Sequence, residues 1–367
     1  MPNKDAYLID MDSLYEDALI LLRELIGTPS LSREENETAD ILCAFLDFRH
    51  IPFQRQVHNV WARNKYWKEG LPVILLNSHH DTVKPAAGWV RSPFYPSIED
   101  GKLYGLGSND AGGPLVALLS AFCHFFEQEN LPFNLIWAGT AEEEISGPNG
   151  IASILPALGP IAVGIVGEPT LLKMAIAEKG LMVVDAEAKG KAGHAAREEG
   201  VNAIYIALED VAWIRQHRFE QESPLLGPVK MTVTQIDAGT QHNVVPDICK
   251  FVIDIRSNEC YSNQEIFEYL QQHLQSVLNA RSFRLNSSHI PLDHPLVQRG
   301  LSLGLEYFGS PTLSDQALMA FPTLKIGPGD SARSHTADEY IRLDELRQGI
   351  EIYIKLLNGL IITTSPD

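Results

Sequence analysis

The sequence has few cysteines and no long hydrophobic run. Its 367 residues include only four cysteines, and none of them has CxxC spacing. Scattered single cysteines predict free thiols rather than a disulfide framework, which favours a reducing compartment such as the cytoplasm. No apolar segment approaches the roughly 18 residues of a membrane span. The first residues also lack the basic-then-apolar order of a signal peptide.

Positive charge is scarce as well. The chain has 47 Asp and Glu residues against 29 Lys and Arg residues, a formal net charge of -18. This balance argues against nucleic acid or an anionic membrane as the partner. Hydrophobic residues make up 45% of the chain, which is enough core for a soluble enzyme of about two domains.

Four apolar runs each lead into a residue type that binds metals. Continuous apolar runs are typical of strands buried on both faces of a mostly parallel sheet. Ligands bind such sheets at the carboxyl ends of the strands. Histidines and carboxylates gathered there indicate a nitrogen and oxygen metal site of the kind that zinc favours. The runs and the residues that follow them are 73–76 with His79 and Asp81, 135–138 with Glu142, Glu143 and Glu144, 161–166 with Glu168, and 323–326 with His335.

Helix and strand signals alternate along the first part of the chain. Ser13 with Glu16 and Ser32 with Glu35 have capping-box spacing, which predicts the start of two amphipathic helices. A further helix is predicted over 115–128, after a glycine-rich loop. Alternation of this kind is the order of an α/β domain, here with helices flanking a mostly parallel sheet.

The pattern changes after residue 179. The β-α-β-β-α-β order that follows is ferredoxin-like. We therefore predict a catalytic domain of residues 1–179 and 288–367, with an inserted ferredoxin-like α+β domain at 180–287. The predicted elements of the insertion are strand 181–188, helix 202–217, strands 229–236 and 250–256, helix 264–278 and a last strand at 282–286.

The candidate residues also have ordinary explanations. His79 and Asp81 would lie on the same side of an extended strand end, where one can bind a metal and the other can orient it. Asp110 lies between Gly107 and the pair Gly112-Gly113, so it could cap the next helix or bridge two metals. The residues 142–144 could be a solvated charge run, Glu168 a turn residue and His335 an incidental loop histidine. Their shared position after buried strands favours the metal site.

Taken together, the motifs resemble the aminoacylase-like di-zinc peptidase and deacylase family, which includes acetylornithine deacetylase, acetyl-lysine deacetylase, succinyl-diaminopimelate desuccinylase and glutamate carboxypeptidase. The resemblance covers nearly the whole chain and implies a zinc-exopeptidase-like α/β fold. The matching segments, in the order of the family, are SHHDTV at 78–83, GSND at 107–110, TAEEE at 140–144, GEPT at 167–170, GHA at 193–195, NVVP at 243–246 and SH at 334–335.

The resemblance implies a site for two Zn²⁺ ions, with Co²⁺ or Mn²⁺ able to substitute. One ion would bind His79 and Glu168, and the other would bind Glu144 and His335. Asp110 would bridge the two ions. The choice among the three consecutive glutamates comes from the family, because spacing alone leaves it open.

Further roles follow from the same resemblance. Asp81 would orient His79, and Glu143 would be the general base. His194 in the inserted domain would cross the interface of a homodimer and polarise the scissile carbonyl. Asn243 and Arg256 look like groups that bind a substrate carboxylate, although a turn asparagine and a surface arginine are equally ordinary explanations.

The implied activity is metal-dependent removal of an N-acyl group from a small-molecule amino acid. The segment 327–331 (GPGDS) is most similar to the acetylornithine and acetyl-lysine deacetylase branch, which favours N-acetylornithine or N-acetyl-citrulline and a setting in arginine biosynthesis. An N-succinyl amino acid deacylase, a dipeptidase or carboxypeptidase of the family, and a metal-binding module without catalysis remain alternatives. Leu106, where the family often has arginine, and 111–113 (AGG), where it often has Met-Lys-Gly, change the expected shape of the pocket.

Overall fold

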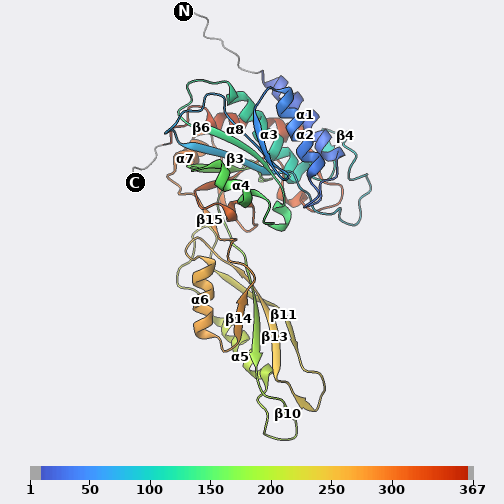
Figure 1. Ribbon diagram of the computed structural model, residues 1–367, viewed down its shortest axis with the longest axis vertical. Coiled ribbons are helices and arrows are strands. Elements are labelled where there is room, and N and C mark those ends of the chain that lie inside the picture. Colours follow the sequence, from blue (N-terminus) through green and yellow to red (C-terminus); the bar gives the residue numbers. More distant parts are fainter. Residues whose placement is uncertain (1–9, 363–367) are drawn as a thin grey trace, which may run out of the picture. The chain divides into compact units, whose positions relative to one another are not determined.

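The computed structural model describes residues 10–362, and the chain forms two compact units (Figure 1). Unit 1 contains the chain up to Ile176, Ile290–Phe308, and the chain from Ser314 onward. Unit 2 contains Ala177–His289 and Gly309–Leu313. No helix in the described part of the chain is long and apolar enough to cross a membrane.

Most of a nine-stranded mixed sheet belongs to unit 1, which confirms the predicted α/β class. The strand order is β1-β2-β6-β3-β7-β17-β8-β15, with β16 paired to β8. The central strands β6, β3, β7 and β17 run parallel to one another. The strands are β1 (Phe53–Gln56), β2 (Asn59–Arg63), β3 (Val73–His79), β6 (Asn134–Thr140), β7 (Val163–Val166), β8 (Met174–Glu178), β15 (Ser288–His289), β16 (Tyr307–Ser310) and β17 (Thr323–Lys325).

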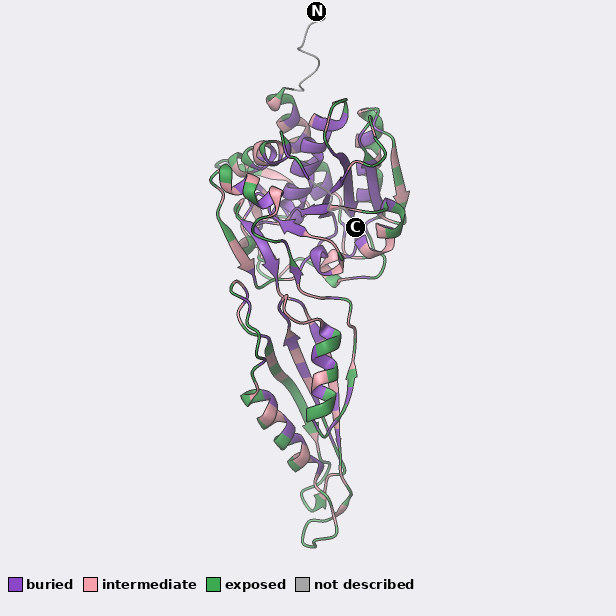
Figure 2. Ribbon diagram, turned by 90° about the vertical axis from the view of Figure 1, so that its left-hand side faces the viewer, coloured by how far each residue is buried: buried purple, intermediate pink, exposed green. Residues whose placement is uncertain are grey.

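Helices cover both faces of this sheet. Helix α3 is almost wholly buried and contacts β3 and β6 on one face, with α1 and α8 packed against it. On the opposite face, α4 packs against side chains of β3 and β6 that include Leu75 and Ile136. Strands β3 and β6 have continuous apolar sequences because both of their faces are buried (Figure 2). The helices are α1 (Met11–Gly27), α2 (Asn36–Phe48), α3 (Gly113–Phe126), α4 (Ile151–Leu158), α7 (Pro295–Ser302) and α8 (Leu343–Leu357).

Neither predicted capping box forms, so that part of the sequence analysis was wrong. Helix α1 begins at Met11, before Ser13, and α2 begins only after Glu35. Instead, the Ser32 hydroxyl donates a hydrogen bond of 2.7 Å to the carboxylate of Asp81. The carboxylate of Glu35 accepts the backbone N–H of Glu142 at 3.2 Å. Both side chains therefore form hydrogen bonds with the segments that follow β3 and β6.

Unit 2 has the predicted β-α-β-β-α-β order. Its antiparallel sheet has the order β11-β13-β9-β14, and α5 and α6 pack against one face of the sheet. The other face is open and exposes Ile236 and Val277. The elements are β9 (Met182–Lys189), α5 (Ala203–Gln216), β11 (Lys230–Ala238), β13 (Ile248–Arg256), α6 (Asn263–His273) and β14 (Val277–Ala280).

The last strand of the four-stranded sheet in unit 2 lies at 277–280, so the prediction of a helix to 278 and a strand at 282–286 was wrong. Apolar periodicity continues past the end of α6, but the backbone becomes extended at Leu274. The cause is Asp210 of α5, whose carboxylate accepts the N–H groups of Gln275 and Ser276 and the Ser276 hydroxyl. These hydrogen bonds stabilise the extended backbone just beyond the last helical turn.

Two small sheets complete the described fold. In unit 1, β4 (Ser97–Glu99), β5 (Lys102–Tyr104) and β18 (Tyr340–Arg342) form a three-stranded sheet in the order β18-β5-β4. In unit 2, β10 (Gly193–His194) pairs with β12 (Val244–Val245). The first of these sheets brings the chain before Asp110 next to the chain that follows His335.

Candidate metal centre

The candidate ligands converge because three of the parallel strands end at the same edge of the sheet. In the register of β3 with β6, His79 lies opposite Thr140, so the loop that begins at Ala141 starts beside His79. Strand β7 pairs with the other side of β3 and ends two residues before Glu168. The carboxyl ends of parallel strands thus place these side chains together.

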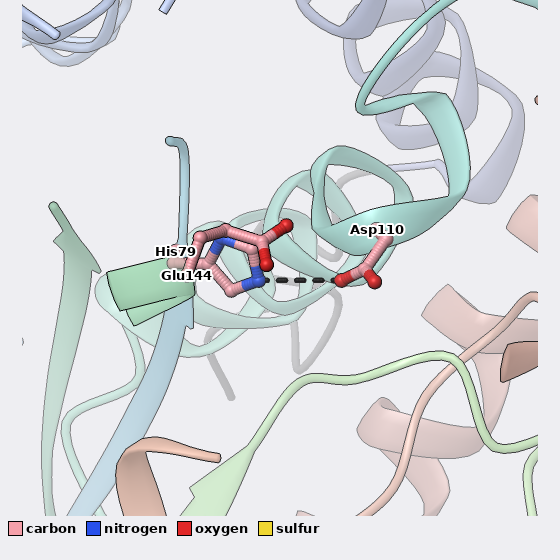
Figure 3. A group of neighbouring side chains, drawn as sticks. All are labelled: His79, Asp110 and Glu144. Carbon is pink, nitrogen blue, oxygen red and sulfur yellow. Dashed lines mark ion pairs between the residues drawn. The ribbon is translucent and has the colours of Figure 1, made fainter. Parts of the chain in front are cut away.

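His79 is the centre of a first group of side chains. It is 1% exposed. Its Nε2 atom lies 3.3 Å from Asp110 Oδ1, 3.7 Å from Glu168 Oε1 and 3.8 Å from Glu143 Oε2. Figure 3 shows the side chains of Asp110 and Glu144 beside the His79 ring, with the ion pair between His79 and Asp110 dashed.

His335 is the centre of a second group. Its Nε2 atom lies 2.9 Å from Glu144 Oε2 and 3.7 Å from Asp110 Oδ2. Asp110 therefore presents one carboxylate oxygen to each histidine. This is the arrangement in which a single carboxylate can bridge two metal ions.

The distances and the hydrogen bonding fit metal ligation. Two ligand atoms held about 2.0–2.2 Å from a tetrahedral zinc ion lie about 3.3–3.6 Å apart. The contacts of His79 with Asp110 and Glu168 are within a few tenths of an ångström of this range. Among the described residues, the buried Nε2 atom of His79 has no hydrogen-bond partner. The contact between His335 and Glu144 is a hydrogen bond that would open to admit an ion.

The electrostatics of the cluster show an excess of acidic groups. Burial raises the pKa of Glu168 to about 8, although His79 opposes this shift. Burial also raises the pKa of Glu143 well above its usual range. The hydrogen bond that His335 donates to the carboxylate of Glu144 raises the pKa of His335 to about 9. The two carboxylate shifts reflect mainly the cost of burying a charged group, with repulsion from neighbouring carboxylates added, and the His335 shift reflects the carboxylate beside it. A divalent cation would favour the ionised carboxylates.

Asp81 supports the cluster in two ways. The Nδ1 atom of His79 lies 3.0 Å from the backbone carbonyl oxygen of Asp81 and 3.4 Å from its carboxylate. The carboxylate also accepts the backbone N–H groups of Glu143 at 3.0 Å and of Glu144 at 3.2 Å. Asp81 thus holds both the ring of His79 and the loop that carries the two glutamates.

Three buried carboxylates near the cluster were missed by the sequence analysis. Glu35 accepts the N–H of Glu142, as described above. Asp315 accepts hydrogen bonds of 2.9 Å from the Asn77 amide and the Thr140 hydroxyl, which ties β3 to β6 just before the ligands. Glu339 accepts backbone N–H groups from the loop of Asp110. Glu35 was interpreted only as part of a capping box, and no signal marked Asp315 or Glu339, because neither directly follows an apolar run.

The three remaining candidates lie in unit 2. His194 is exposed on β10, and its Nδ1 atom accepts the N–H of Ala196. The backbone carbonyl of Asn243, which directly precedes β12, accepts the N–H of Ala195 at 2.9 Å. Arg256, at the end of β13, donates to both carboxylate oxygens of Asp254, at 2.9 and 3.2 Å. These residues belong to a different unit from the metal cluster, and their roles stay predictions.

Comparison with known protein families identifies the group to which the chain belongs. Residues 75–359 match the family described as Peptidase family M20/M25/M40. The chain is a member of this family. The matched range contains every candidate ligand and the whole of unit 2, so the resemblance inferred from the motifs is confirmed. The protein is therefore an M20-family hydrolase.

Known proteins support the same assignment at the level of sequence and fold. The acetylornithine deacetylase of Edwardsiella ictaluri is 30% identical over 370 residues, which cover 91% of this chain and 95% of that protein. The aminopeptidase PepT of Bacillus cereus has a TM-score of 0.72 and 19% identity, covering 96% of this chain and 99% of that one. A dinuclear metal binding peptidase of the M20 family from Bacillus subtilis has a TM-score of 0.72 and 15% identity, covering 94% and 98%. The two structures share the fold of this chain.

The position of Asp110 between the two histidines generates a test. Asp110→Ala removes both bridging oxygens, so we expect the variant to lose metal from both sites rather than from one. Elemental analysis of the purified protein measures the number of ions per chain. Asp338→Ala is the matched control, because its carboxylate accepts backbone N–H groups at 90–91 instead. Two ions per chain in the Asp110 variant at full activity would contradict the assignment.

Proposed function

We propose that the protein is a two-metal amidohydrolase that removes an N-acyl group from an amino acid, with an activity like that of acetylornithine deacetylase. The observation that carries this proposal is the placement of Asp110, with one oxygen 3.3 Å from His79 and the other 3.7 Å from His335. Glu168 and Glu144 complete the two groups of ligands. Zinc would suit the mixture of imidazole and carboxylate, and cobalt or manganese would be accepted in its place.

The chain supplies the proton transfer that amide hydrolysis requires. Two bound zinc ions would supply a water of lowered pKa and would polarise the amide carbonyl. Glu143 lies beside His79 and is held through its backbone by Asp81, so it can take a proton from the attacking water. The same carboxylate then returns the proton to the departing amine. Its burial raises its pKa, which suits a group that must be protonated midway through the reaction.

The choice of an N-acyl amino acid rests on the 30% identity to acetylornithine deacetylase over almost the full length of both chains. A substrate of this class carries a free carboxylate, which Arg256 could bind in place of Asp254 and which Asn243 could hydrogen-bond. N-acetyl-citrulline and N-succinyl amino acids belong to the same chemical class. The second candidate is a peptidase, which the fold shared with an aminopeptidase favours.

Assembly and location form the last part of the proposal. We infer a homodimer in which unit 2 of one protomer supplies His194 to the metal site of its partner, where the imidazole would stabilise the developing oxyanion. All four cysteines are free thiols, which suits the reducing cytoplasm. The acidic chain suits a small-molecule substrate better than a nucleic acid or a membrane.

Two isosteric substitutions separate the base from the ligand. We expect Glu143→Gln to keep both metals and to lower kcat by about 10²–10⁴, because a general base contributes about that factor. Glu144→Gln should instead weaken the site that contains His335, because it removes a charged ligand. Metal content and kcat are measured on both variants. If the two phenotypes are exchanged, the assignment of the consecutive glutamates is shifted by one residue.

The substrate class is tested with a matched panel of amides. We expect N-acetylornithine or N-acetyl-citrulline to give a higher kcat/KM than N-succinyl-ornithine, N-succinyl-diaminopimelate and a set of dipeptides, measured as release of free amino acid. A clear preference for dipeptides would move the protein to the peptidase branch. A chain that binds two metals and cleaves none of these compounds would be a metal-binding module.

The origin of His194 is tested by mixing two inactive variants. In a mixed dimer of His194→Ala and Glu143→Gln chains, one site has both Glu143 and the partner-derived His194 intact. If the histidine acts across the interface, random mixing should restore about one quarter of wild-type activity, because half of the dimers are mixed and each has one complete site. Activity that stays at the level of the separate variants would show that His194 acts within its own chain or not at all.

A further inference from the structure

Glu339 is a buried carboxylate whose partners belong to the loop of Asp110. Its side chain is almost fully buried, at 2% exposure. One oxygen accepts the backbone N–H groups of Asn109 at 2.8 Å and of Asp110 at 3.0 Å, and the other accepts the N–H of Gly107 at 3.1 Å. Glu339 and Asp110 are 229 positions apart, so this is a tertiary contact rather than a local turn.

The surroundings of Glu339 hold a negative charge without a positive partner. Among residues 10–362, no lysine, arginine or histidine forms an ion pair with its carboxylate. A buried charge of this kind is costly unless it is well hydrogen-bonded. Three N–H groups of one loop supply these bonds.

Glu339 joins the two segments that carry Asp110 and His335. The backbone carbonyl of Glu339 accepts the N–H of Gly105 at 3.0 Å. Directly after Glu339, β18 pairs with β5, and β5 ends just before the loop of Asp110. His335 precedes Glu339 by four residues. The backbone and the side chain of Glu339 thus connect the segment that holds His335 to the loop that holds Asp110.

This connection helps to fix the position of the two carboxylate oxygens of Asp110. Gly107 has a left-handed φ of 76°, and the short helical turn Ser108–Gly112 has non-helical φ and ψ at Asp110. The hydrogen bonds to Glu339 therefore add to the few that this segment makes within itself. A bridging carboxylate must reach two ions about 3.5–4 Å apart, which leaves little room for displacement. The backbone N–H of Asp110 donates a hydrogen bond to Glu339. This bond holds the backbone from which the Asp110 side chain extends.

We propose that Glu339 is a positioning residue that sets the affinity for both metal ions by holding the backbone of Asp110. The inference rests on the proposed two-metal function. It differs from the direct roles assigned above, because Glu339 would touch neither metal nor substrate. Removing a residue that orients a metal ligand typically weakens metal affinity by about 10–100-fold.

The test compares Glu339→Gln with Asp210→Asn. Both substitutions remove the charge from a buried carboxylate that accepts backbone N–H groups, but Asp210 does so in unit 2. Cobalt(II) is titrated into the metal-free forms of the wild type and both variants, and folding is checked by circular dichroism. We expect Glu339→Gln to weaken both binding steps by at least about 10-fold and to change the visible spectrum of the bound cobalt. Asp210→Asn should keep the wild-type affinities and spectrum.

The outcomes distinguish a failure of the positioning role from a failure of the two-metal function. Wild-type affinity and spectrum in a folded Glu339→Gln variant would overturn the positioning role and leave the metal site intact. Failure of the wild-type chain to bind cobalt would overturn the two-metal function and the positioning role with it. If Glu339→Gln does not fold, hydrogen exchange in the metal-free wild type decides. Slow exchange of the N–H groups at 107, 109 and 110 supports the proposal, and the fast exchange of an unheld loop would overturn it.

Discussion

Mutual repulsion among buried carboxylates is the constraint on which the rest of unit 1 depends. Asp110, Glu143, Glu144 and Glu168 meet at one edge of the sheet, where His79 and His335 contact them. Such a gathering would spread apart unless the backbone around it were held firmly. The parallel strands provide the first restraint, because β3 is hydrogen-bonded along its length between β6 and β7.

A second set of carboxylates provides the remaining restraint. Asp81 and Glu35 accept the successive N–H groups of 142–144, and Asp315 ties together the side chains that precede two of the ligands. These groups add negative charge to a region that already has too much, yet each one uses its oxygens to fix backbone or side-chain donors. These carboxylates raise the electrostatic energy of the region, but they also fix the positions of the loops that carry the candidate ligands. A divalent cation at the centre would offset the negative charge.

The sequence predicted most of the fold and the grouping of the ligands, for identifiable reasons. Runs such as 73–76 and 135–138 are apolar because they are buried on both faces, and burial of this kind leaves a clear signal. His79, Glu168 and the run of three glutamates follow such runs within a few residues, so strand ends indicated them. Asp110 and the choice among the three glutamates came from the family resemblance instead. Features that arise from tertiary contacts left no such signal. The early end of α6 depends on Asp210, and the true partners of Ser32 and Glu35 lie far along the chain.

The pairing of β8 with β15 has a consequence for how such a chain could arise. Glu178 lies opposite Ser288 and Ala177 opposite His289 in adjacent antiparallel strands, so the chain leaves the nine-stranded sheet and returns to it at neighbouring positions. A short turn joining these two strands would make an ordinary hairpin, with the host sheet unchanged. The ferredoxin-like segment is thus, in topological terms, an enlarged hairpin loop. A change in the length of this segment would leave the hydrogen-bond ladder beside the candidate metal ligands unbroken.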